Sequence, residues 1–284
     1  MRILGLLVFL LTLQVHAENQ IVTKIHDVDF GNHQGDEILV FLKSGHVAKI
    51  DEFNLKLIEE LQFSKSRGEW LRLTLDEGRN IVDVETSEAP YETSAPKSIL
   101  DLPHPYVPTT IESMAKAKAY IAESRRPITE RVTQCFNRAM IWTYEWWKKH
   151  SLRSNKVFVF WTKDYVRKTG HEWWFHVAPY AHVMDEDGVV KERVLDVKWL
   201  SRPYEFQAWA DYHSPRDLKC KVVKKYSDYA NHPWGMNCYF IRTHMYTWQP
   251  MDLELYESWD NYSKNAYNMD EVRAAYLEAF GVSL

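Results

Sequence analysis

Residues 172–197 read EWWFHVAPYAHVMDEDGVVKERVLDV. β-Branched and aromatic residues recur at both ends of this stretch, and the DEDG tetrapeptide at 185–188 is a strong turn signal. The pattern therefore predicts two antiparallel strands, 172–184 and 189–197, joined by that turn. Side chains alternate between the two faces of such a hairpin.

The hairpin carries a histidine in one strand and an aspartate in the other, His176 and Asp196. If the turn pairs Met184 with Gly188, these two residues face each other across the strands. A register shifted by two makes them diagonal neighbours on the same face. An odd register would place them on opposite faces. The Asp196 carboxylate can therefore lie beside the His176 imidazole only if the register is even.

A helix is expected ahead of the hairpin. Thr133 can cap it, and apolar residues from Phe136 to Trp147 recur at the spacing of one helical face. Cys135 then lies in the first turn. Residues 156–161 form a further extended run. A helix that leads into a meander of antiparallel strands predicts an α+β fold.

Cys135, His176 and Asp196 together make a candidate catalytic triad. A helix N-terminus and a nearby imidazolium activate a thiol, the histidine acts as base and then as acid, and the carboxylate orients it. Backbone amides at the helix start can stabilise an oxyanion. The alternative is structural, because a histidine in an aromatic strand is usually a core residue and an aspartate often ends a strand. His171 and His182 flank the same strand and are rival bases.

Composition excludes several classes of protein. The chain has 284 residues, 45% hydrophobic and 26% charged, which is typical of globular proteins rather than of disordered or collagen-like chains. Its formal net charge of -4 gives no electrostatic reason to bind nucleic acid. We find no phosphate-binding glycine loop. His176, His182 and Asp185 lack the ligand spacing of typical zinc sites, so no metal is expected.

Residues 1–17 have the pattern of a secretory signal. Arg2 supplies the positive end, 3–13 an apolar run, and 15–17 a small-residue cleavage site. The run is too short to span a bilayer, so we expect an exported protein, secreted or periplasmic, without stable membrane insertion.

Export affects how the three cysteines are interpreted. In an oxidising compartment, Cys220 and Cys238 can close a loop through a disulfide, which leaves Cys135 as a functional or an inert thiol. A different pairing remains open.

The chain divides into four expected segments. Residues 1–17 are the signal, 18–85 a small α+β domain, 86–110 a linker with five of the 11 prolines, and 111–284 an aromatic-rich domain. The elements expected in the small domain are a hairpin of 38–42 with 46–50, a helix at 55–63 and a hairpin of 70–75 with 80–84.

Three short blocks resemble the catalytic blocks of the bacterial protein-glutaminase family. They are CFNRA at 135–139, WFHVA at 174–178 and RVLD at 193–196. Their order fits the family, and so do the intervals of 41 residues from cysteine to histidine and 20 from histidine to aspartate. The resemblance extends over 133–209.

The resemblance implies a secreted protein deamidase with a core like those of transglutaminases and papain-like proteases, in which a Cys-bearing helix packs on an antiparallel sheet. Cys135 would form a thioester with the glutamine side chain of a protein or peptide substrate, His176 would transfer protons, and Asp196 would hold His176. No cofactor is implied. The family is made with an inhibitory pro-region removed by a protease, a role that 18–85 fits by architecture.

The sequence departs from the family pattern at two places, of which the second concerns substrate choice. Val197 stands where the family usually has proline, and the WWF run at 173–175 is bulkier than expected. The rival hypotheses are a related thiol peptidase, amidase or transglutaminase acting on peptides or cell-wall peptides, and a non-enzymatic aromatic-rich binding module with an inert Cys135.

Overall fold

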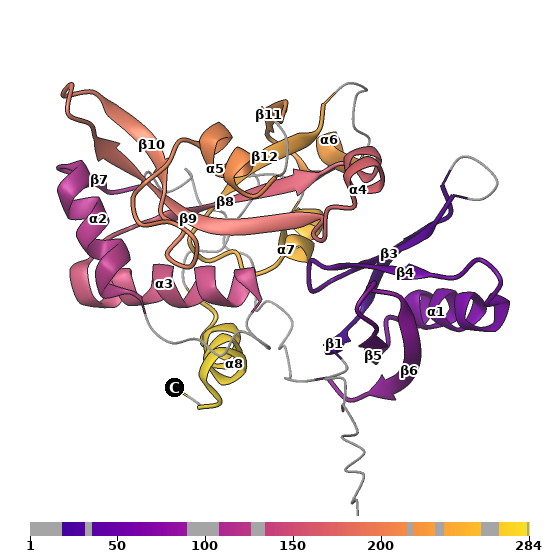
Figure 1. The fold of residues 1–284 in the computed structure, drawn as a ribbon. Coiled ribbons are helices and arrows are strands. Elements are labelled where there is room, and N and C mark those ends of the chain that lie inside the picture. Colours follow the sequence, from indigo (N-terminus) through magenta and orange to yellow (C-terminus); the bar gives the residue numbers. More distant parts are fainter. Residues whose placement is uncertain are drawn as a thin grey trace, which may run out of the picture.

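The computed structural model describes residues 19–31, 36–89, 108–125, 134–214, 218–230, 236–256, 267–282 and 284. The expected signal at 1–17 and most of the expected linker, 90–107, lie outside these residues. Figure 1 shows a smaller N-terminal part beside a larger part built around one extended sheet. Helices and sheets make up both parts, and the expected α+β fold is confirmed.

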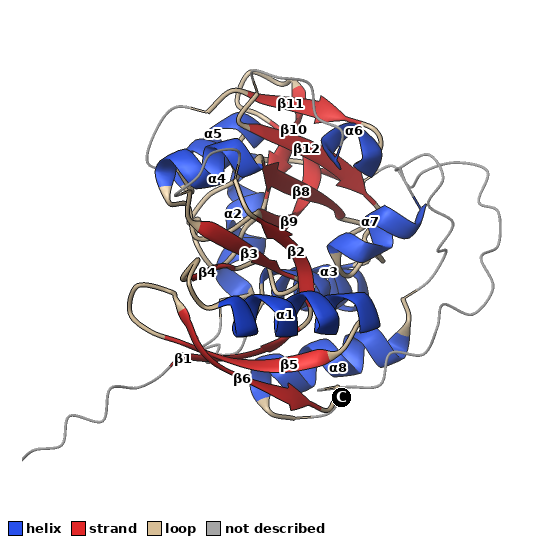
Figure 2. Ribbon diagram, turned by 90° about the vertical axis from the view of Figure 1, so that its right-hand side faces the viewer, coloured by secondary structure: helices blue, strands red, loops and turns tan. Residues whose placement is uncertain are grey.

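The N-terminal part consists of two three-stranded sheets and one helix. One sheet has the order β1-β5-β6 and the other the order β2-β3-β4. The elements are β1 (Asn19–Thr23), β2 (Ile25–Asp29), β3 (Ile38–Leu42), β4 (Val47–Ile50), α1 (Leu55–Arg67), β5 (Trp70–Leu75) and β6 (Ile81–Ser87). Both expected hairpins and the expected helix are present. Figure 2 shows α1 beside the β1-β5-β6 sheet.

Local sequence explains how α1 begins and ends. The Asn54 side chain accepts a hydrogen bond from the Leu57 backbone N–H, and Gly68 ends the helix in the left-handed conformation. Leu57 and Leu61 are buried in a cluster of aliphatic residues shared by the two small sheets.

The larger part is centred on a six-stranded sheet. Its order is β10-β9-β8-β12-β11, and β7 pairs with β9 off this path. The strands are β7 (Thr110–Ile111), β8 (Asn155–Trp161), β9 (Phe175–Met184), β10 (Val190–Val194), β11 (Cys220–Val223) and β12 (Cys238–Thr243). The path from β10 to β12 is antiparallel, whereas β11 and β7 join in parallel. Thr110 was expected in the linker and instead opens β7.

Helices surround this sheet. They are α2 (Met114–Glu123), α3 (Cys135–His150), α4 (Lys163–Thr169), α5 (Phe206–Tyr212), α6 (Tyr226–Ala230), α7 (Pro250–Tyr256) and α8 (Met269–Phe280). α3 packs against β9, and α8 packs against α3. No helix among those described is long and apolar enough to cross a membrane.

α3 begins one residue after its N-cap Gln134, whose side chain makes no capping bond. The expected cap, Thr133, lies outside the described residues. Phe136 and Trp146 are buried as the apolar stripe predicts, but Trp147 is 40% exposed. Basic residues in the last turn lie at the negative end of the helix dipole, where positive charge stabilises the helix.

The turn of the β9–β10 hairpin sets a register two positions away from the one we first considered. Met184 pairs with Val190 rather than with Gly188. Gly188 has a φ of 73°, and the Asp185 N–H donates to the Val189 carbonyl, so the turn takes up more residues before the strands pair. The shift is even, so the alternation of faces is kept.

A disulfide links the two strands at one edge of the large sheet. Cys220 of β11 and Cys238 of β12 are directly opposite in the parallel register and form a disulfide. Cys135 is a free cysteine.

Candidate active site

Cys135 is the first residue of α3. The first backbone N–H groups of a helix have no partner inside the helix and carry its positive dipole end. Burial raises the pKa of the Cys135 thiol to about 11, although Arg138 and the backbone N–H of Val177 act in the opposite direction. The thiol, which is half-buried, is therefore protonated in this arrangement.

His176 and Asp196 lie together in the core of the larger part. His176 Nε2 is 2.7 Å from Asp196 Oδ2, and the two side chains are only 2% and 1% exposed. Their pairing through Nε2 leaves the second ring nitrogen, Nδ1, for another partner. No hydrogen bond joins His176 to the Cys135 thiol among the residues that the structure describes.

Asp196 does not lie in the second strand, contrary to the sequence-based prediction. β10 ends at Val194, and Asp196 follows it at the start of a turn. The Leu195 N–H still donates to the Pro179 carbonyl, which continues the β9–β10 register by one residue. Asp196 therefore reaches His176 as a diagonal neighbour beyond the end of the strand.

Two further side chains meet Asp196 that we did not predict. Trp209 Nε1 donates to Asp196 Oδ2 over 3.0 Å, and His213 Nε2 is 3.4 Å from the same oxygen. The His213 ring centre is 4.6 Å from that of His176. Trp209 and His213 are four residues apart, at the end of α5, so helical spacing alone places them on one face. Nothing in the sequence indicated which face meets Asp196.

Burial and pairing act in opposite directions on the pKa values of Asp196 and His176. Burial opposes ionisation of Asp196, but His176 and His213 outweigh it and hold the pKa of Asp196 well below its usual range. Burial lowers the pKa of His176 to about 4, against the opposite effect of Asp196. The imidazole is thus a neutral group beside a carboxylate, which is the state of a base.

Aromatic rings enclose the imidazole of His176. The Trp173 ring centre lies 5.6 Å from that of His176 and 5.9 Å from that of Trp199. Trp173 and Trp199 are half-buried, whereas Trp209 is fully buried. The bulky residues before His176 therefore form part of the wall of the site.

The β3–β4 hairpin of the N-terminal part pairs with the segment that leads into His176. The Val47 N–H donates to the Glu172 carbonyl over 2.8 Å, and the Trp174 N–H donates to the Gly45 carbonyl over 3.0 Å. Between these bonds, His46 and Trp173 form an antiparallel bridge. The hairpin is thus joined through its backbone to the residues just before β9.

Side chains also contribute to this contact between the N-terminal part and the segment before β9. The Trp174 indole N–H donates to the Leu42 carbonyl over 2.7 Å, and the His26 ring stacks on Trp174 with centres 4.3 Å apart. Burial, together with the charge of Arg138 in α3, lowers the pKa of His46 to about 4. His46 therefore lies near the α3 turn that follows Cys135.

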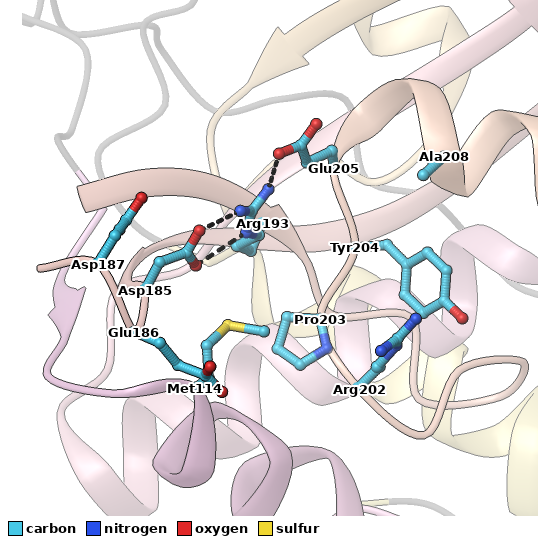
Figure 3. A pocket seen from close by; sticks show the side chains of 10 residues that line it. All are labelled: Met114, Asp185, Glu186, Asp187, Arg193, Arg202, Pro203, Tyr204, Glu205 and Ala208. Carbon is cyan, nitrogen blue, oxygen red and sulfur yellow. Dashed lines mark hydrogen bonds and ion pairs between the residues drawn. The ribbon is translucent and has the colours of Figure 1, made fainter. Parts of the chain in front are cut away.

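A separate groove of about 440 Å³ lies at the far end of the β9–β10 hairpin. Figure 3 shows Arg193 between Asp185 in the turn and Glu205 ahead of α5. About nine strand residues separate this turn from His176, or roughly 30 Å at 3.3 Å per residue. The groove is therefore distinct from the site around Cys135, and its ion pairs connect the hairpin to the start of α5.

The rival histidines occupy other surroundings. His171 packs against Trp161, with ring centres 4.4 Å apart. His182 lies in β9 opposite Glu192, toward the far end of the hairpin. Neither belongs to the described group of side chains around Asp196.

Comparisons with known proteins bear on the family and on the fold of this chain. Residues 111–213 match the family model described as glutaminase. A mutant of pro-protein-glutaminase shares the fold with a TM-score of 0.52 at 15% identity, over 91% of this chain and 92% of that one. Pro-protein-glutaminase itself gives 0.47 at 14% identity over the same shares. Protein-glutaminase from Chryseobacterium proteolyticum gives 0.32 at 16% identity, over 49% and 75%. Among curated protein sequences, none is similar enough to count as a match.

Proposed function

The chain belongs to the protein-glutaminase family through its residues 111–213, and on that premise we propose that it hydrolyses glutamine side-chain amides in proteins or peptides to glutamate and ammonia. The observation that carries this proposal is the buried His176–Asp196 pair, 2.7 Å apart, beside the helix that begins with the free Cys135. Each group has the chemistry that the reaction requires.

In the first half of the reaction, the Cys135 sulfur attacks the carboxamide carbon. His176 accepts the thiol proton at Nδ1 while Asp196 holds Nε2. Backbone N–H groups at the start of α3 are placed to stabilise the oxyanion, a contribution of about 3–4 kcal/mol per donor in related reactions. The carbon–nitrogen bond then breaks, the proton leaves with ammonia, and a thioester remains on Cys135.

In the second half, His176 removes a proton from water, and the resulting hydroxide attacks the thioester. The carbon–sulfur bond breaks, glutamate leaves, and the sulfur recovers its proton. Trp209 holds the Asp196 carboxylate throughout by its hydrogen bond. These steps need no metal and no organic cofactor.

We propose in addition that residues 18–85 are a pro-region and that a protease releases it by cutting within the linker, 86–110. The backbone pairing of Gly45 and Val47 with the segment before His176 supports this role. The likeness to a pro-form over most of both chains is consistent with it. In the covered state, burial keeps the thiol of Cys135 protonated.

Export from the cytoplasm belongs to the same proposal. The Cys220–Cys238 disulfide supports it, because disulfides persist in oxidising compartments. The pattern of 1–17 provides the signal.

The test is ammonia release from glutamine peptides and from a folded protein, before and after limited proteolysis of the linker. We expect release that rises after the cut and disappears in Cys135→Ala. Peptide fragments without ammonia would favour a peptidase, cross-linked products a transglutaminase, and no product of any kind a binding module. Release by Cys135→Ala at the parent rate would exclude the thiol mechanism.

A further inference from the structure

His213 is a buried imidazole for which the proposed hydrolysis has no role. It follows α5 as its C-cap residue, and its side chain is 4% exposed. Its Nε2 lies 3.4 Å from Asp196 Oδ2 but makes no aligned hydrogen bond. The other oxygen of Asp196, Oδ1, is also buried without a partner. Burying a polar atom without a partner is unfavourable, so a ligand that satisfies both atoms would be favoured.

The unpartnered atoms belong to a donor set that suits a transition metal. One ligand atom each from His176, Asp196 and His213 lies within 4.8 Å of the other two. Two imidazoles and a carboxylate are a known ligand set for zinc, at about 2.0–2.2 Å from the ion. The three side chains come from β9, from the turn after β10 and from the end of α5, so modest inward movements of separate elements bring them to those distances.

The surroundings supply support that metal sites use. Trp209 Nε1 donates to Asp196 Oδ2 and fixes the carboxylate from outside the ligand set. Hydrogen bonds of this kind orient ligands and raise metal affinity. The buried Asp196 carboxylate also lies within 3.4 Å of a ring nitrogen from each of the two histidines, an arrangement that suits a cation.

We propose that His176, Asp196 and His213 form a binding site for a divalent transition-metal ion of the zinc class, and that the bound ion inhibits the thiol chemistry. The ion takes the place of the proton between His176 Nε2 and Asp196, and that proton moves to Nδ1. A ring that carries its proton on Nδ1 has no lone pair with which to accept the thiol proton. The inhibitory effect rests on the proposed function, whereas metal binding itself does not.

Cys135 must be removed from the binding test because a thiolate is itself a good zinc ligand. We therefore suggest titrating Zn²⁺ into the full-length Cys135→Ala protein by calorimetry and following Co²⁺ by its visible absorption. One equivalent should bind. His213→Gln should weaken binding on the order of 10–100-fold, and His171→Gln, which changes a half-buried histidine outside the ligand set, should leave it unchanged.

A spectroscopic measurement covers the case in which His213→Gln does not fold. The imidazole nitrogens of Cys135→Ala can be followed by long-range proton–nitrogen correlation during addition of Zn²⁺. The Nε2 signals of His176 and His213 should move together, and those of His182 should not. Absence of binding by Cys135→Ala, unchanged affinity in a folded His213→Gln, or Zn²⁺-dependent shifts only at other histidines would overturn the site.

The inhibitory consequence is tested separately on the linker-cut protein. Zn²⁺ should abolish ammonia release by the parent, and a chelator should restore it. With each rate taken relative to the same protein's rate without Zn²⁺, His213→Gln should need on the order of 10–100-fold more Zn²⁺ than the parent for half inhibition. Equal inhibition of parent and variant would contradict the proposal. If neither protein released ammonia without Zn²⁺, the proposed function would fail, and the binding measurements would still decide the site.

Discussion

His46 and Trp173 are antiparallel bridge partners, although they lie in different parts of the chain. The bridge joins the turn of the β3–β4 hairpin to the segment that leads into His176. Backbone hydrogen bonds on both sides of the bridge hold the hairpin there. The N-terminal part is therefore attached to the segment immediately before His176.

The contact at Gly45 gives the first prediction. Gly45 has a φ of 97°, and a Cβ at this position would lie 3.1 Å from the Phe175 ring. Gly45→Val should unseat the hairpin and expose the site in the uncut protein. We expect faster alkylation of Cys135 by iodoacetamide, measured by mass spectrometry against time.

Gly68→Val is the matched control for backbone strain. Gly68 also has a positive φ, of 65°, but no atom lies within 4 Å of a Cβ built there. It should lower stability without changing the alkylation rate of Cys135. If Gly45→Val and Gly68→Val reacted equally slowly, the hairpin would not be the cover of the site.

The second prediction concerns Trp209. Trp209→Phe keeps a ring in the core but removes the N–H that donates to Asp196. A hydrogen bond to a charged group contributes about 1.5–3 kcal/mol, so kcat for ammonia release should fall roughly 10–100-fold with little change in KM. Trp146→Phe is the control, because it removes a comparable indole bond to Ser124 between α2 and α3. An equal loss of kcat in both variants would show a general effect on folding instead.

The third prediction is a pH dependence of stability. Glu278 of α8 accepts a hydrogen bond from Asn137, two residues after Cys135. Burial raises the pKa of Glu278 from 4.5 to about 7 against the effect of Asn137. As pH rises from 4.5 toward 7, the unfolded chain loses this proton before the folded chain does. The free energy of unfolding should therefore fall across that range, by on the order of 1–3 kcal/mol, and level off above it.

Glu278→Gln removes the titrating group and should remove this part of the slope, as measured by denaturant unfolding between pH 5 and pH 8. Glu59→Gln, at an exposed position of α1, should retain the parent slope. Parallel curves for Glu278→Gln and the parent would contradict the prediction.

Local patterns in the sequence were sufficient for much of the fold. The helix expected at 55–63 and the apolar stripe of α3 depend on neighbouring residues, and the structure has both helices. The sequence pattern placed Cys135 in the first turn of this helix, and the structure has it as the first helical residue, although the N-cap is Gln134. These features depend on short-range spacing, which a single sequence displays.

Contacts between residues far apart in the chain could not be predicted from the sequence. Asp196 was expected within a strand, but β10 ends at Val194, where a bridge to Tyr204 redirects the chain. The approach of Trp209 and His213 to Asp196 depends on how α5 packs. Local spacing gives no information on which distant surface a helix will meet.

The most direct test of the deamidase mechanism is to follow where the oxygen of water goes. A folded glutamine-containing protein is incubated with the linker-cut chain in heavy-oxygen water and then mapped by mass spectrometry. We predict glutamate at former glutamines, each with one oxygen from the solvent, in a substrate that is neither cleaved nor cross-linked, and no such conversion by Cys135→Ala. Unconverted glutamines beside cleaved or cross-linked substrate, or conversion that persists without Cys135, would contradict the central claim.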